Sequence, residues 1–351
     1  MPGPIPVIDL EPWFSGNRLQ RLELCQQVGR LCHQAGFFYI VNHGIPMHVS
    51  EFYLATLKRF FALPQATKQA IDKQGSAQFR GWEKLGSELT NNQIDCREQI
   101  DIGVERTAIA DPDPYYMALE GPNQWPPQAE LPGFHETVTD YFTHLSAVAR
   151  QILRIMSLAL GLDENHIERV FGKNPSPYLK LIRYPKTRAG GYGVGAHKDS
   201  GFLTLLLQDE NPGLEAQAND NTWHPVNPVP GSLVVNTGEL LQLLTCNYFI
   251  ATPHRVINRV DSERYSSAFF YSPDLNTLLD PLPIDSTYID AVKRSERHRN
   301  EGLMASRAEM AAGTGGMASK HKQGVFGERY WQRWVRSYPE IARKYYPDHM
   351  A

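Results

Sequence analysis

Apolar residues in the first half of the chain recur at helical spacing. From Leu24 to Ala35 they lie three or four residues apart, which predicts a helix with one apolar face. Residues 49–61 predict a second helix, and the apolar run at 37–41 predicts a strand. The helical spacing returns from Phe134 to Ala159, so we expect a long amphipathic helix of about seven turns that ends at Gly161.

After this helix the pattern changes to short apolar runs separated by turn residues such as Asn211-Pro212-Gly213. Many short strands with turns between them favour a sandwich or barrel over a parallel sheet. We expect loops with short strands over residues 65–130, and a helix rich in aromatic residues over 326–346. The strands that we expect in the second half cover residues 178–184, 201–207, 213–216, 232–236, 254–258 and 266–271.

The composition limits the possible classes of function. The 351 residues are 42% hydrophobic and 21% charged, which is ordinary for a globular protein with a sizeable core. The net charge of -3 argues against a generally basic binder of nucleic acid or membranes. No apolar stretch approaches the ~18 residues of a membrane span, and the first ten residues lack the features of a secretory signal. The four cysteines are scattered, so we expect no disulfide framework and a cytoplasmic location.

Three chemically distinctive features follow one another in the β-rich half. His197 and Asp199 form an H-x-D motif, and residues i and i+2 of an extended strand point to the same face. A nitrogen of His254 would complete a face of two histidines and one carboxylate, which suits a non-haem Fe(II) oxygenase better than tetrahedral zinc. Arg264 and Ser266 form an R-x-S motif and, by the same alternation, can meet one carboxylate.

Each motif also has a plainer interpretation. An H-x-D tripeptide alone is a ligand pair in no more than about one case in ten. His224 offers another later histidine, and Arg264 could form a surface ion pair with Asp261 or Glu263. The complete ordered set within a β-rich half favours the chemical interpretation.

Longer segments around these motifs resemble the isopenicillin N synthase-like family of iron(II)/2-oxoglutarate-dependent oxygenases. Their order and spacing agree with the family as well as their letters do, so the resemblance is specific. The matching segments read IPVIDL at 5–10, GFFYIVNHGIP at 36–46, LKLIRYP at 179–185, GAHKDSGFLTLLLQD at 195–209, GLEAQ at 213–217, NTGELLQLLTC at 236–246, TPHRV at 252–256 and RYSSAFFYSP at 264–273.

The resemblance implies an α+β fold with a double-stranded β-helix (jelly-roll) core, flanking N-terminal helices and a supporting helix from Phe134. It implies an N-terminal region at residues 1–125 and a catalytic region with a C-terminal helical lid at 126–351, together one compact unit. It further implies O2 as a co-substrate, Fe(II) bound by His197, Asp199 and His254, and 2-oxoglutarate bound by Arg264, Ser266 and Tyr184.

Two features leave alternatives open. Many relatives carry an asparagine two residues before the tyrosine of LKLIRYP, where this chain has Ile182, and the intervening Arg183 either points toward the substrate or caps an edge strand. The R-x-S motif also occurs in relatives that bind a substrate carboxylate and use no 2-oxoglutarate. An isopenicillin N synthase-like oxidase is therefore one alternative, and a non-catalytic binding protein on the same fold is another.

The leading hypothesis is an oxygenase that hydroxylates or desaturates a small organic molecule while 2-oxoglutarate is converted to succinate and CO2. We expect a monomer or weak homodimer, with no nucleic-acid or membrane partner. Residues 293–324 are polar and contain several glycines, so we expect a lid, or else a surface insertion. The expected substrate residues are Arg183, Phe270, Phe79 and Arg80, with Arg97, Gln99, Tyr330, Trp331 and Trp334 as further candidates.

Overall fold

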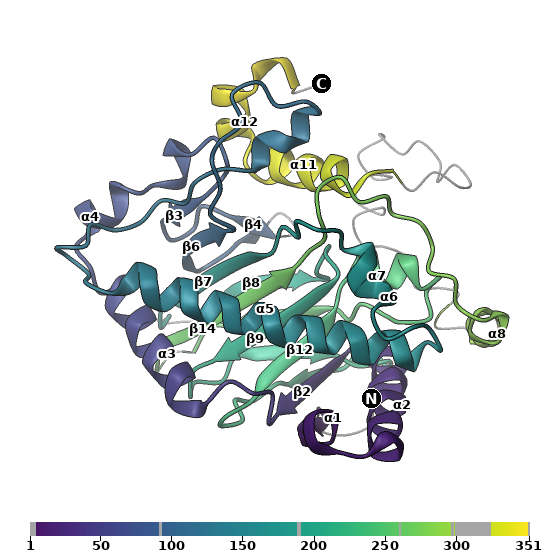
Figure 1. Cartoon of the computed structure of the whole chain (residues 1–351). Helices are drawn as coiled ribbons and strands as arrows, with labels where there is room; N and C mark the ends of the chain where they lie inside the picture. Colours follow the sequence, from purple (N-terminus) through teal and green to yellow (C-terminus); the bar gives the residue numbers. More distant parts are fainter. Residues whose placement is uncertain are drawn as a thin grey trace.

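The chain folds around two β-sheets in the computed structural model, which describes residues 5–90, 93–187, 191–259, 261–295, 298 and 324–349 (Figure 1). The larger sheet has eight strands in the order β1-β2-β12-β9-β14-β7-β6-β3, and only β1 and β2 pair in parallel. The bounds are β1 Val7–Asp9, β2 Phe37–Val41, β3 Gly81–Glu83, β6 Glu98–Gly103, β7 Tyr178–Tyr184, β9 Leu203–Gln208, β12 Leu233–Thr237 and β14 Arg264–Tyr271.

A smaller sheet, in the order β11-β10-β13-β8, encloses an apolar interior together with the larger one. Tyr184 and Ala268 from the larger sheet pack there in one cluster with Val194 and Val256 from the smaller sheet. Two sheets enclosing one core form the predicted jelly roll, and the helices make the fold α+β, as expected. The bounds are β8 Tyr192–His197, β10 Leu214–Gln217, β11 Trp223–Pro225 and β13 His254–Ile257, with a separate pair, β4 Leu89–Thr90 and β5 Gln93–Ile94.

Helices cover the outer face of the larger sheet, and α5 (Phe134–Ala159) is the long helix that the sequence predicts (Figure 1). It ends where Gly161 adopts a φ of +71° and the N–H of Leu162 donates to the carbonyl of Ser157 (3.0 Å). No helix in the described part of the chain is long and apolar enough to cross a membrane. The other helices are α1 Glu11–Ser15, α2 Arg18–Gln34, α3 Met47–Phe61, α4 Gln65–Gln69, α6 His166–Val170, α7 Glu239–Leu244, α8 Ser286–Arg294, α11 Phe326–Ser337 and α12 Pro339–Tyr345, with 3-10 turns at Lys73–Gly75, Tyr115–Leu119 and Pro347–His349.

The structure differs from the sequence prediction at β8 and at the C-terminus. Strand β8 was not predicted, because its glycines lack β propensity. The structure explains one of these glycines, since a Cβ at residue 193 would lie only 2.5 Å from the Tyr184 ring and would clash with it. The predicted C-terminal helix is divided in two, with Pro339 as the first residue of α12. Most of the predicted lid, residues 299–323, lies outside the described residues.

Strands from both predicted regions of the chain share the larger sheet. Strand β2 pairs with β12, and β6 pairs with β7. The ladder therefore joins strands that come before residue 125 to strands that come after it. This pairing brings β3 and β6 to the same wall of the interior as the R-x-S strand, β14.

A buried ionic cluster lies at the β6 and β3 end of the larger sheet. The ammonium of Lys73, a residue only 1% exposed, donates to Glu83 (2.8 Å), to Asp101 and to the hydroxyl of Tyr338 (2.8 Å). Asp101 lies opposite Lys180 where β6 pairs with β7. Because side chains alternate along a strand and the neighbours of Lys180 on β7 face outward, both of these side chains point into the interior. The wall of the interior is therefore ionic at this end and apolar in the middle.

We expect Lys73→Met to lower the free energy of unfolding by about 3–5 kcal/mol, because it leaves two buried carboxylates without their cation. Lys58→Met is the control, because it removes an exposed pair with Glu210 (3.2 Å) and a contact 5.6 Å from the centre of the Tyr265 ring, and should cost less than about 1 kcal/mol. Urea unfolding followed by circular dichroism measures both losses. Equal losses in the two variants would contradict a stabilising role for the cluster.

Candidate active site

Three potential metal ligands meet where β8 ends and β13 begins. His197 is the last residue of β8 and lies directly opposite His254, the first residue of β13. The Nε2 atoms of both histidines lie 3.7 Å from Oδ1 of Asp199. One ligand atom from each of the three residues lies within 4.8 Å of the others. The structure thus brings the predicted set together, although Asp199 lies in the loop after β8 and not on the strand face that the alternation argument assumed.

Backbone carbonyls fix the orientation of both imidazole rings. Nδ1 of His197 lies 2.9 Å from the carbonyl oxygen of Gly195, and Nδ1 of His254 lies 3.1 Å from that of Thr252. A ring nitrogen that donates to a carbonyl carries the proton, which leaves Nε2 free to bind a metal. Burial, with His254 as a close neighbour, lowers the pKa of His197 to about 4, so this ring is neutral at neutral pH.

Asp199 is oriented by two strands of the larger sheet. Thr204 of β9 (2.6 Å) and Asn236 of β12 (2.7 Å) both donate hydrogen bonds to its Oδ2 atom. Burial acts to raise the pKa of Asp199, but the two histidines and these hydrogen bonds lower it below its ordinary value. The carboxylate is therefore ionised at neutral pH, with Oδ1 directed at the imidazoles.

This donor set fits Fe(II). Two neutral imidazole nitrogens and one carboxylate oxygen form a facial set of three ligands, which leaves positions for co-substrates on an octahedral ion. No other group of three His, Cys, Asp or Glu side chains in the described ranges lies close enough together to hold a metal. His224, the alternative histidine, instead contacts the hydroxyl of Thr222 (2.9 Å) at an exposed position.

A buried arginine lies in the same interior, on β14. Arg264 is only 3% exposed, and its guanidinium donates to Ser266 (3.2 Å) and to Gln208 (2.8 Å). Its Nε atom has no hydrogen-bond partner within the described part of the chain. The guanidinium also lies 5.0 Å from the ring of Tyr184. The alternative surface ion pair with Glu263 is not formed, since Glu263 binds Arg183, and the Arg264 cluster has the chemistry to hold a carboxylate.

The predicted substrate residues of the sheet lie on opposite faces. Phe270 lies on the inner face of β14, between Thr204 of β9 and Tyr178 of β7 in the sheet register. Arg183 lies on the outer face of β7, where its guanidinium binds Glu98 (3.0 Å) and Glu263 (2.5 Å). The inner position of Phe270 is compatible with substrate contact, whereas Arg183 points away from the histidines.

Phe79 and Arg80 have partners that explain their burial without a substrate. The ring of Phe79 is stacked 5.7 Å from Trp334 and 6.2 Å from Tyr346. Arg80 donates to the backbone carbonyls of Val104 and Gly121, at 2.7 Å each. Of the further candidates, Arg97 binds Glu88 and Asp95, Gln99 donates to Glu83 and Glu88, and Tyr330, Trp331 and Trp334 lie on α11.

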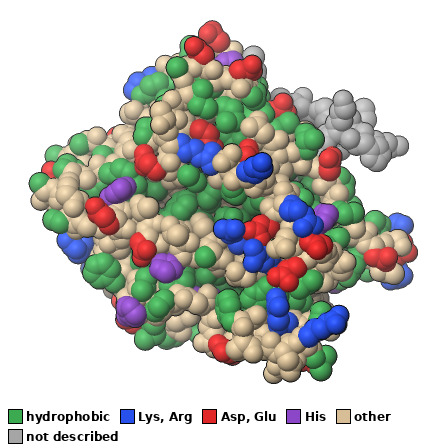
Figure 2. Space-filling model, viewed as in Figure 1, with side chains coloured by type: hydrophobic (Ala, Val, Ile, Leu, Met, Phe, Trp, Pro, Cys, Tyr) green, Lys and Arg blue, Asp and Glu red, His purple; other side chains and the backbone are tan. Residues whose placement is uncertain are grey.

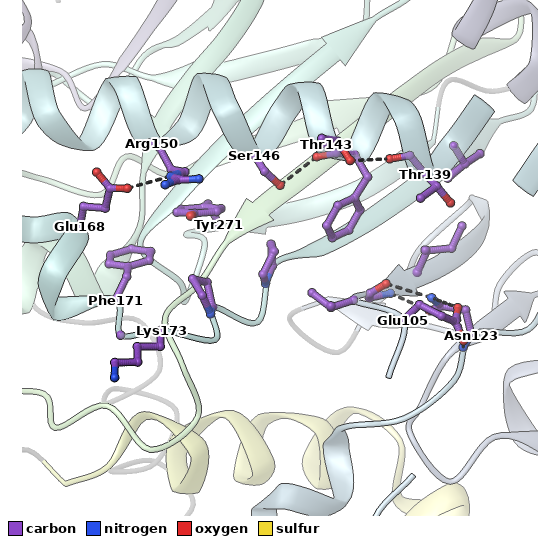
Figure 3. A pocket seen from close by; sticks show the side chains of 18 of the residues that line it. Glu105, Asn123, Thr139, Thr143, Ser146, Arg150, Glu168, Phe171, Lys173 and Tyr271 are labelled. Carbon is purple, nitrogen blue, oxygen red and sulfur yellow. Dashed lines mark hydrogen bonds and ion pairs between the residues drawn. The ribbon is translucent and has the colours of Figure 1, made fainter. Parts of the chain in front are cut away.

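A cavity of about 520 Å³ lies on the outer side of the larger sheet, along α5 (Figure 3). The ion pair between Arg150 and Glu168 lies at one end of it, and Glu105 with Asn123 lies at the other. On the face of the molecule seen in Figure 2, basic and acidic side chains lie next to one another over α5 and α6. None of the three metal-ligand candidates lines the cavity, so it is distinct from the candidate iron site.

A jelly roll with two histidines and one carboxylate beside a buried Arg–Ser pair defines the class of non-haem iron oxygenases. Residues 176–273 match the family model of the 2OG-Fe(II) oxygenase superfamily. Residues 5–128 match a second family model, described as "non-haem dioxygenase in morphine synthesis N-terminal". The chain belongs to the family of Fe(II)- and 2-oxoglutarate-dependent oxygenases. The predicted enzyme class and its use of Fe(II), 2-oxoglutarate and O2 are confirmed, and neither the oxidase nor the non-catalytic alternative is favoured.

Three relatives illustrate the family match. The 2-oxoglutarate-Fe(II) type oxidoreductase hxnY of Emericella nidulans is 34% identical, over 79% of this chain and 82% of its own length. A homoarginine-6-hydroxylase of Glycine max is 32% identical, over 84% of this chain and 92% of its own. The crystal structure of a full-length Neurospora crassa protein in complex with alpha-KG and thymine has a TM-score of 0.71 and 26% identity, and covers 89% of this chain and 97% of that one.

Sequence reasoning missed the residues that orient the ligands. Thr204 and Asn236 both belong to segments that resemble the family, but their contact with Asp199 appears only when β9 and β12 pair. A polar residue in an otherwise apolar strand was the available signal, since a buried hydroxyl or amide needs a partner. The same holds for Gln208, which contacts Arg264.

We expect Thr204→Val, which preserves shape but removes the hydroxyl, to weaken Fe(II) binding by about 10- to 100-fold, because Asp199 loses one of the bonds that orient it. Thr139→Val, on the exposed side of α5, is the matched control. Equilibrium titration with Fe(II) under argon measures both affinities. Unchanged iron affinity in Thr204→Val would show that the hydroxyl does not position the carboxylate.

Proposed function

We propose that this oxygenase hydroxylates a small organic molecule, with Fe(II) bound by His197, Asp199 and His254. The observation that carries the proposal is the oriented ligand set, in which both Nε2 atoms and one carboxylate oxygen converge. When bound, iron with 2-oxoglutarate supplies the activation of O2 that C–H oxidation requires. The residues of this chain supply position, charge balance and exclusion of water.

In this proposal Arg264 and Ser266 bind the distal carboxylate of 2-oxoglutarate, and Tyr184 borders it. Arg264 is buried without a counter-ion within 4 Å in the described ranges, so an incoming carboxylate would meet an uncompensated cation. Apolar residues of both sheets, such as Ile182 of the larger sheet and Val256 of the smaller one, surround this position. They keep water from competing for the carboxylate and so strengthen the ionic contact.

Hydroxylation is proposed ahead of desaturation because of the names that relatives carry. The Glycine max and Arabidopsis thaliana proteins named homoarginine-6-hydroxylase are 32–33% identical to this chain over 75–84% of its length. Phe270, on the inner face beside Thr204, is the sheet residue that we assign to the substrate side. Phe79, Arg80 and Arg183 are left out of the substrate site because other contacts hold them.

The proposal also includes a cytoplasmic enzyme that acts as a monomer or weak homodimer, without nucleic-acid or membrane partners. The net charge of -3 supports this part, since polyanion binders are generally basic. The four cysteines support it too, because they are free thiols in the structure. Gel filtration and cell fractionation test these two statements separately.

Arg264→Ala should raise the KM for 2-oxoglutarate by about ten- to a hundred-fold, since a charge-assisted hydrogen bond contributes about 1.5–3 kcal/mol. Ser266→Ala should have a smaller effect, because it removes a neutral donor. Arg259→Ala, a half-exposed arginine that pairs with Asp261 (3.7 Å), is the control and should leave this KM unchanged.

The measurement is succinate release together with O2 uptake at varied 2-oxoglutarate. Substrate oxidation that proceeds without 2-oxoglutarate and without succinate would contradict the proposal. In that case Arg264 would be assigned to the carboxylate of the substrate.

A further inference from the structure

Arg333 on α11 is a partly buried cation that the iron and 2-oxoglutarate sites do not use. Its guanidinium lies 5.1 Å from the ring of Trp334 and 6.0 Å from the ring of Tyr330. Burial acts to lower the pKa of Arg333, but the nearby Tyr330, Tyr178 and Glu88 raise it above its ordinary value, so this guanidinium lies near the ionic end of the interior. Trp334 packs 5.1 Å from the ring of Tyr178, which fixes α11 over the end of β7.

The carboxylates in this region already have cations. Glu83 and Asp101 contact Lys73, and Glu88 contacts both Lys180 (3.1 Å) and Arg97 (2.5 Å). Arg333, by contrast, has no carboxylate within 4 Å in the described part of the chain. One oxygen of Asp101 has no hydrogen-bond partner in the described ranges, but that carboxylate is already paired with Lys73, whereas the guanidinium of Arg333 is paired with no carboxylate and can meet an anionic group.

The sheet register fixes how far Tyr178, which packs against α11, lies from Thr204, which contacts Asp199. Thr204, which contacts Asp199, is paired with Phe270, and Phe270 is paired with Tyr178. Two strand spacings therefore separate Thr204 from Tyr178, roughly 10 Å. The rings of Phe270 and Tyr178, 5.8 Å apart, form an apolar floor along this path.

The hydroxyl of Tyr178 adds a donor at the same place. Burial, together with the nearby Asp101, raises the pKa of Tyr178 well above its ordinary value, so the hydroxyl keeps its proton at neutral pH. A protonated phenol and a guanidinium can both donate to one carboxylate.

We propose that Arg333, assisted by Tyr178, binds the carboxylate of a small organic acid and so selects the substrate of the oxygenase. The acid spans the aromatic floor, with its carboxylate at the Tyr178 end and the carbon to be oxidised at the Thr204 end, two strand spacings or roughly 10 Å away. This inference rests on the proposed function, and it names the substrate class of that same site. Arg333 positions the substrate and takes no part in the oxidation itself.

Binding of a panel of straight-chain and aryl carboxylic acids of graded length, each with its primary amide, tests the inference. The enzyme is loaded with Fe(II) and 2-oxoglutarate without O2, and Kd is measured by titration calorimetry. We expect acids of one length range to bind and their amides to bind at least about tenfold more weakly, as for loss of a charge-assisted hydrogen bond. Arg333→Gln should raise the Kd of the best acid by about ten- to a hundred-fold, and Arg333→Lys should restore part of the affinity.

Arg336→Gln is the matched control, since Arg336 lies one helical turn further along α11 and is exposed. It should leave the Kd of the acid unchanged, and the affinity for 2-oxoglutarate should be the same in every variant. Equal binding of acids and amides, an unchanged Kd in Arg333→Gln, or no binding of any acid would overturn the inference. Because these titrations need no turnover, an acid that binds through Arg333 without stimulating succinate release would contradict the proposed function alone.

Discussion

The pairing of β8 with β13 is the constraint on which the site depends, because its register sets His197 directly opposite His254. Backbone carbonyls of the same sheet region then turn both Nε2 atoms toward one point. The third ligand, Asp199, is held from the other side, by strands β9 and β12 of the larger sheet. The three ligands can converge only when the two sheets enclose the interior, so the metal site and the jelly roll form together.

The larger sheet separates two environments through simple alternation of side chains. Its outer face packs on α5 and the other helices, and Arg183 is directed to that side. Its inner face runs from the apolar surroundings of Arg264, past Phe270, to the ionic cluster around Lys73. The carboxylates of that cluster are paired with Lys73, Lys180 and Arg97, whereas Arg333 of α11 has no carboxylate within 4 Å in the described ranges and is the cation that we propose for an anionic substrate.

Local patterns predicted the elements best where one periodicity extends far, as in the helix from Phe134 to Ala159. The three candidate metal ligands could also be proposed from the sequence, because histidine and aspartate in family order carry the chemistry themselves, and the structure brings the three together. The pattern could not show that Arg183 faces outward or that Phe79 and Arg80 have structural partners, since these facts follow from long-range pairing of β6, β7 and α11. Arg333 was missed for a similar reason, because an arginine on an amphipathic helix resembles a solvated side chain until its surroundings are known.

The most direct test of the central claim is anaerobic titration of the metal-free protein with Fe(II) and then 2-oxoglutarate, followed by visible absorption. The account predicts a single equivalent of iron and a charge-transfer absorption that requires both additions, because the keto acid binds to the same ion that the three side chains hold. In His254→Ala both the tight iron binding and the absorption should be lost. Full iron occupancy with an unchanged absorption in that variant would contradict the account.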